Sequence, residues 1–162
     1  MAQQYDVKTY HASASGTAVN YRTRLKQIIL SPATVSLRNF AVADPTVFKS
    51  GTWSRTGTTV TVTINGNGLT NGQRVFLDIA PGTTMRDGVY EVSNVTTNTF
   101  TVTSVTSGVA TGTVTMYTSI YAEFDTYQTV SIPIKIPGEG ILCENGIYIG
   151  MGPSVTSTIV YG

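Results

Sequence analysis

Hydrophobic and polar residues alternate with a period of two along much of the chain. In residues 58–64, Val60, Val62 and Ile64 fall on one side and threonines on the other. Successive side chains of a strand point to opposite faces, so this pattern predicts a strand with one buried face. The 18 valines, 28 threonines and 16 glycines, without leucine or alanine at helical spacing, favour an all-β fold.

The first part of the chain predicts two strands before residue 50. In residues 19–25, inward-facing residues alternate with Arg22 and Arg24, and Lys26 continues the outer row, so we expect one long strand with a basic outer face. A break at Ser31-Pro32 precedes a second strand over residues 34–42. A strand is also expected in the opening segment, residues 5–11.

From about residue 51 the pattern changes to short strands separated by glycine-rich turns. Three Asn-Gly pairs in residues 65–72 supply the positive-φ positions of tight turns. The expected strands here are 58–64, 74–79, 89–95, 100–105 and 111–117. Five short strands at such spacing predict a small sandwich or open barrel.

After residue 117 the earlier pattern returns. Strands are expected over 120–124, 130–136, 141–144, 147–151 and 155–161. Pro133 indicates an edge strand, because proline cannot donate to a sheet ladder. We therefore predict a β-sandwich, jelly-roll or Ig-like, built from residues 1–50 and 115–162, with residues 51–114 inserted as a small β module. The module should fold alone.

Charge supports this nested plan. Residues 1–50 carry a net charge of +4, residues 51–114 are neutral, and residues 115–162 carry −3. Opposite charges on the two outer segments are expected if their strands pair. Chance, or contact between oppositely charged faces of different subunits, explains the same split.

Candidate chemistry is sparse. One histidine, His11, and one cysteine, Cys143, exclude His/Cys metal clusters and internal disulfides by counting. Asp78, Asp87 and Glu91 lack the close spacing of a calcium loop, and the Asn-Gly run lacks a phosphate loop's third glycine and following helix. Sequence spacing does not establish a carboxylate pair among Asp125, Glu139 and Glu144. We expect no catalytic residues, cofactor or metal.

Charge and hydropathy also limit the partners. Only 12% of residues are charged and the net charge is +1, so no field attracts nucleic acid or an anionic membrane. No signal peptide or apolar run of about 18 residues is present, so we expect a protein made in a cytoplasm and not inserted in a membrane. Nine tyrosines offer core or subunit contacts or, alternatively, a glycan platform. The candidate interface residues are Arg22, Arg24, Lys26, Tyr148 and Tyr161.

Two sets of segments carry a resemblance. Residues 59–62, 67–78, 87–92 and 98–102, with Gly82, resemble a β module that recurs in structural proteins of tailed bacteriophages; Asn67 stands where the familiar turn has histidine. Residues 5–8, 22–26, 136–142, 145–148 and 160–162 resemble small virion-type proteins of marine phages, cyanophages among them. Neither set is a catalytic motif.

The resemblance implies a setting rather than a reaction. It implies a non-enzymatic structural protein of a tailed-phage virion, made in the host cytoplasm, most specifically a capsid decoration or cement protein that binds the head. The expected partners are the major capsid protein or other virion proteins and further copies of the chain. A tail, neck or fibre component is one alternative. A carbohydrate-binding module that attaches to host glycans is another.

Overall fold

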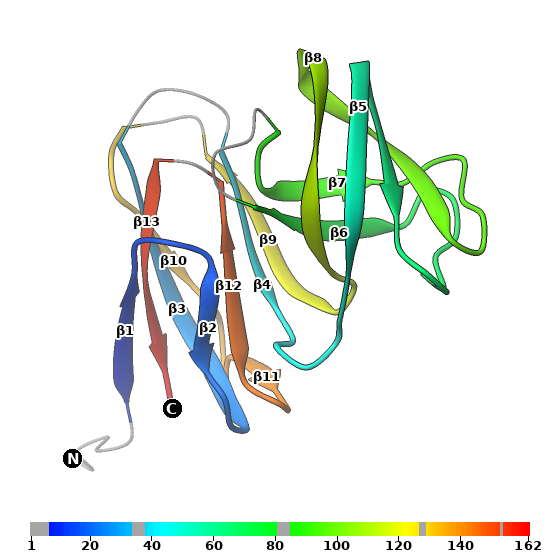
Figure 1. Cartoon of the computed structure of the whole chain (residues 1–162). Helices are drawn as coiled ribbons and strands as arrows, with labels where there is room; N and C mark the ends of the chain where they lie inside the picture. Colours follow the sequence, from blue (N-terminus) through cyan, green and yellow to red (C-terminus); the bar gives the residue numbers. More distant parts are fainter. Residues whose placement is uncertain (1–6, 34–37, 81–84, 127–128, 153) are drawn as a thin grey trace, which may run out of the picture.

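The protein is built entirely of β-strands in the part of the chain that its structure, a computed structural model, describes (Figure 1). That part comprises residues 7–33, 38–80, 85–126, 129–152 and 154–162. The strands are β1 (Lys8–Ala12), β2 (Gly16–Val19), β3 (Thr23–Pro32), β4 (Arg38–Ala43), β5 (Phe48–Thr63), β6 (Arg74–Ile79), β7 (Gly88–Glu91), β8 (Thr99–Tyr117), β9 (Ile120–Thr126), β10 (Ile132–Lys135), β11 (Ile141–Cys143), β12 (Ile147–Met151) and β13 (Val155–Tyr161). Over these residues, nothing forms a helix with the length and hydropathy that a membrane crossing requires.

Two antiparallel sheets form a sandwich from the two ends of the chain. One sheet has the order β1-β13-β3-β10, with β11 also paired to β3, and the other has the order β2-β12-β4-β9. Inward-facing residues of β3 and β13, such as Leu25, Ile28 and Ile159, are fully buried in one core with Phe40 and Ile149 of the facing sheet. The predicted all-β sandwich fold is confirmed.

A third sheet, with the order β5-β8-β6-β7, has a core of its own around Trp53. Strands β5 and β8 pair along a long ribbon that bends where the register passes from Gly57↔Gly108 to Thr59↔Thr103. Gly57 has a φ of 67° at this bend, a conformation that favours glycine. The side chain of Arg55 is buried inside the bend, where it donates hydrogen bonds to Thr106.

Several predicted strand boundaries are wrong. Residues 19–25 are not one strand, because β2 and β3 belong to different sheets and the chain crosses between them at residues 20–22. Strand β3 extends through Pro32, which is its last residue and needs no further ladder bond. Segments 100–105 and 111–117 are parts of the single strand β8, because Gly108 permits a bend without ending the pairing.

Other boundaries shift less. Strand β7 ends at Glu91, after which only Ser93 forms an isolated bridge, to Thr101. The expected strands 5–11 and 34–42 fall partly on residues 1–6 and 34–37, which lie outside the described residues. The third sheet uses strands between Phe48 and Tyr117, slightly more than the predicted insert 51–114. That this insert folds independently stays a prediction.

Candidate functional site

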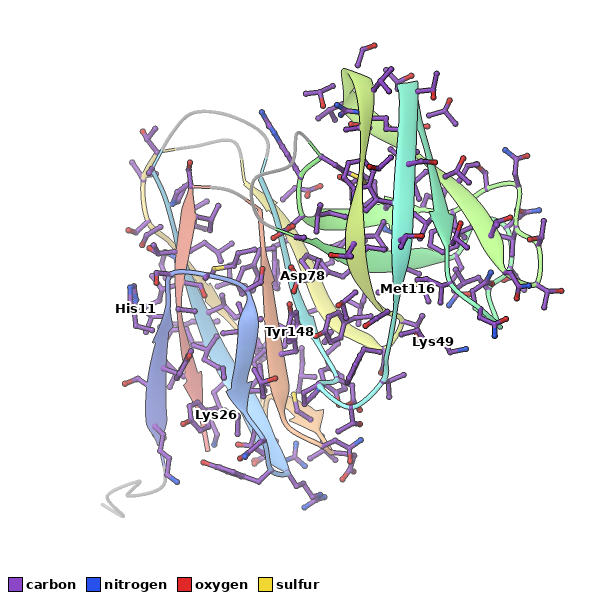
Figure 2. All side chains as sticks on the ribbon, in the orientation of Figure 1. His11, Lys26, Lys49, Asp78, Met116 and Tyr148 are labelled. Atoms are coloured by element: carbon purple, nitrogen blue, oxygen red, sulfur yellow. The ribbon has the colours of Figure 1, made fainter. Side chains whose placement is uncertain are left out.

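The three basic candidate residues lie at the start of β3. Arg22 is exposed in the turn before the strand and its Nε donates to Glu144 Oε2 at 2.7 Å. Arg24 and Lys26 are half-buried on the outer face of β3, and Figure 2 shows Lys26 on the sandwich, far from the third sheet. The structure thus joins a basic residue of the first segment to an acidic residue of the last, as the charge pattern predicts within one chain. A contact of these residues with a partner stays a prediction.

The two candidate tyrosines are both buried, in different places. Tyr161, 9% exposed, ends the strand β13 and is paired in register with Lys8 of β1. Tyr148, 3% exposed, lies on β12 between the sandwich and the third sheet (Figure 2). The side chain of Tyr148 therefore contacts other parts of its own chain. A contact of Tyr148 or Tyr161 with another subunit stays a prediction.

The surroundings of Tyr148 form the junction between the sandwich and the module. The ring of Tyr148 stacks on Tyr117 of β8, with centroids 3.9 Å apart and planes at 21°. Phe76 of β6 completes the group, with its centroid 6.2 Å from that of Tyr148. We call this set the aromatic junction; it consists of the buried residues Ala41, Ala43, Phe76, Val89, Tyr117 and Tyr148, with Ile120 packed against them.

Phe76 fits the junction only because a glycine lies opposite. A Cβ at Gly150 of β12 would lie 2.3 Å from Phe76 Cζ, closer than any van der Waals contact. Aromatic pairs of this kind contribute about 0.5–1.5 kcal/mol beyond their buried area. The module is therefore seated on the sandwich by complementary shapes as well as by apolar area.

A carboxylate lies beside the rings. The Tyr148 hydroxyl donates to Asp78 Oδ2 of β6 at 2.5 Å. Burial, together with this carboxylate, raises the pKa of Tyr148 far above its ordinary value. The tyrosine therefore remains a hydrogen-bond donor at any physiological pH and cannot serve as a base there.

A second carboxylate of the module, Asp87, also faces the sandwich. Asp87 Oδ1 accepts from the Ile79 amide at 2.8 Å, and Ser15 Oγ, from the turn between β1 and β2, lies 3.5 Å from Asp87 Oδ2. The same Ser15 hydroxyl accepts from the Met151 amide at 3.0 Å. Burial, and to a lesser degree the charge of Asp78, raises the pKa of Asp87 to about 6.

In the described part of the chain, the potentially reactive side chains do not converge on one site. His11 lies on β1 with its Nδ1 3.0 Å from Thr158 Oγ1, far from the junction (Figure 2). Cys143 is buried, which raises the pKa of its thiol to about 11 and keeps it protonated. Glu144 is engaged by Arg22. Among the residues that the structure describes, no three His, Cys, Asp or Glu side chains gather as a metal site would require.

The Asn-Gly run forms a turn, as its sequence predicts. Asn67 is buried; its amide donates to the Thr96 carbonyl at 2.9 Å and its Oδ1 accepts from the Leu69 amide at 3.0 Å. The side chain of Lys49 binds the Gly66 and Asn67 carbonyls from the adjoining strand. A groove of about 410 Å³ lies beside this turn, lined by Asn67, Leu69 and Phe48 among others. A second groove of the same volume is lined by residues that include Ser50 and Asp78.

The aromatic junction was largely missed by sequence reasoning. The sequence gives Tyr148 as a candidate interface residue, but Phe76 and Gly150 carry no signal that links β6 to β12. The one usable signal was the alternation of β6, in which Phe76 faces away from Val75 and Leu77 and so required a partner outside the module's own core.

The chain has little similarity to known proteins. No family model matches it and no curated protein is similar to it. Among solved structures, a phage protein, the phage phi92 endosialidase, aligns with 80% of this chain at 19% sequence identity and a TM-score of 0.33. The chain spans 20% of the length of that protein. A TM-score this low transfers neither fold nor activity.

Proposed function

We propose that this protein is a non-enzymatic structural protein of a tailed-bacteriophage particle. The observation that carries the proposal is the aromatic junction, which fixes a protruding β module to a β-sandwich by buried contacts. A protein that must hold a projecting part in one orientation needs such a junction, whereas an enzyme needs converging reactive groups. His11, Cys143 and Glu144 are each engaged in separate places.

The specific role that we propose is capsid decoration, with the major capsid protein as the partner and the virion as the location. The sandwich would bind the head, and the module would project from it. The resemblance of the sequence to phage structural proteins supports this setting. Low charge supports it too, because many copies can lie side by side without strong repulsion.

Copy number in purified particles tests this role. Quantitative mass spectrometry against the major capsid protein should find hundreds of copies per particle. A handful of copies would instead indicate a tail, neck or fibre component. Complete absence from the particles would refute the structural role.

A second measurement distinguishes carbohydrate binding from capsid decoration. Purified protein is applied to a glycan array and, in parallel, to assembled capsids that lack it. Saturable binding to capsids without glycan binding supports decoration. Specific glycan binding without capsid binding would replace decoration by host attachment.

A further inference from the structure

Strand β1 leaves one edge of the sandwich open. It is the last strand of its sheet, paired on one side with β13 and on the other with no described strand. Figure 1 shows β1 at the side of the sandwich away from the module, with no ribbon beyond it. Within the part of the chain that the structure describes, its outer backbone groups are therefore open to pairing with another chain.

Four other edge strands of the described residues carry features that oppose such pairing. Strand β10 contains Pro133 and an exposed Lys135. Strand β2 has four residues and a register shift against β12, and β5 is bent at Gly57. Strand β9 carries Glu123 and Asp125. Prolines, bulges, charges and short length are the usual means of blocking edge pairing.

Strand β1 has few of these features. Its five residues pair with β13 in unbroken register, and it contains no proline. Its one ionised side chain at neutral pH, counting the histidine as neutral, is Lys8 at its first position. A regular edge of this kind is a template for one more strand.

Half-exposed apolar side chains accompany this edge. Val7, Tyr10 and Tyr21 are 38%, 40% and 46% exposed. The Lys8 ammonium holds Tyr21 in place: its Nζ lies 3.2 Å from the hydroxyl and 5.3 Å from the ring centroid. The edge thus offers fixed apolar surface as well as backbone groups.

We propose that β1 pairs antiparallel with β1 of a second copy of this chain, which joins two sandwiches through a continuous sheet. Tyr10 is the central residue of the strand, so a two-fold axis at Tyr10 pairs all five residues. Thr9 then faces His11 of the other copy, and Lys8 faces Ala12.

The charge of the strand favours this antiparallel arrangement. With the axis at Tyr10, the two Lys8 side chains lie at opposite ends of the paired strands. A parallel in-register arrangement would place the two ammonium groups side by side and does not arise from a two-fold axis normal to the sheet. The two Tyr10 rings meet on the same face, where cross-strand aromatic pairs are favourable.

Sedimentation velocity of the full chain over a concentration series tests the dimer. The wild type should dimerise, and Tyr10→Glu should weaken dimerisation at least about tenfold, because it places two carboxylates at the axis. Val109→Glu, at a site 84% exposed on the module, is the matched control and should dimerise as the wild type does. A monomeric wild type, or equal effects of both variants, would overturn the proposal.

Disulfide trapping tests the register even if Tyr10→Glu harms folding. Tyr10→Cys places the two thiols opposite each other, so air oxidation should give a reducible dimer. Thr9→Cys is the control, because its two Cα atoms would be about 8 Å apart, beyond the reach of about 7 Å for a disulfide. Cys143 is buried and does not compete. A wild-type dimer that neither variant traps would show that another surface mediates association.

Discussion

The sandwich and the module reach their buried cores by different routes. The sandwich core combines residues from both ends of the chain, such as Leu25 and Ile159, whose strands β3 and β13 lie side by side. The module core uses a continuous segment, from Trp53 to Met116. We therefore expect the module to fold alone, whereas the sandwich needs both outer segments. The aromatic junction thus joins one part made from a continuous segment to another made from both ends of the chain.

Excising the module should give the largest effect. Phe48 and Tyr117 are paired in register, so a short turn can replace residues 49–116. We expect an isolated 48–117 fragment to fold. We expect the shortened chain to fold but self-associate, because it keeps Tyr117 but loses Phe76 and Val89, which cover Tyr148 and its neighbours. Circular-dichroism melting and size-exclusion chromatography measure both. An unfolded 48–117 fragment would contradict a self-contained module.

Phe76→Ala tests the junction without removing either part. Phe76 is fully buried, and truncation of such a ring costs about 3–5 kcal/mol. Urea unfolding should show this loss of free energy of unfolding, with the module and sandwich becoming separable transitions.

Phe48→Ala is the control for Phe76→Ala, because Phe48 is 53% exposed. It should cost about 1 kcal/mol or less, as exposed substitutions usually do. Equal losses in the two variants would mean that the junction is no more important than the surface beside it.

Sequence patterns predicted the elements better than their connections. Alternation placed β6 and β13 within their observed bounds, and Asn145-Gly146 marked the turn between β11 and β12. Alternation reports which face of a strand is buried but not which sheet contains the strand, so the crossing at residues 20–22 was missed.

The candidate site was harder to predict than the fold. Tyr148 carries the same pattern whether its ring meets another subunit or another sheet of the same chain. The contact of Gly150 with Phe76 could not be predicted, because a glycine in a strand indicates a close approach but not which residue approaches it. The opposite net charges of the two outer segments predict that these segments meet, as Arg22 and Glu144 do, but they identify neither residue of the pair.

A pH titration measures how Asp87, which lies where the module faces the sandwich, contributes to the free energy of unfolding. The pKa of Asp87 is raised to about 6, so the folded protein favours the protonated form; this stabilisation is present near pH 4 and is lost as pH rises through about 6. Ionisation should cost about 2 kcal/mol after allowance for partial solvent access. Asp87→Asn should remove that loss between pH 5 and 7, measured by urea unfolding.

Asp44 provides the internal comparison for this titration. Burial opposes its ionisation, but hydrogen bonds from Thr46, Asn145 and Tyr121 outweigh burial and lower the pKa of Asp44. Its stabilisation is therefore present above its ordinary pKa and is lost only as pH falls below about 4. Asp44→Asn should leave the slope between pH 5 and 7 unchanged, whereas a flattened slope would assign the effect to the wrong carboxylate.

The smallest effects should come from the two ion pairs. Arg74 of the module binds Glu123 of the sandwich through two nitrogens, and Arg22 binds Glu144 within the sandwich. Both arginines are at least half exposed, so each pair should contribute about 0–1 kcal/mol. The Arg74 pair should be the stronger because Glu123 is only 23% exposed.

Double-mutant cycles with alanine at each pair, in low and high salt, measure these coupling energies. A coupling above about 2 kcal/mol for Arg74 and Glu123 would show that charge, and not the aromatic junction, holds the module in place. With the small values that we expect, the close packing of Phe76 on Gly150 contributes more than the ion pair to holding the module in place. The opposite net charges of the outer segments then indicate which segments lie together, although their ion pairs contribute little to the free energy of unfolding.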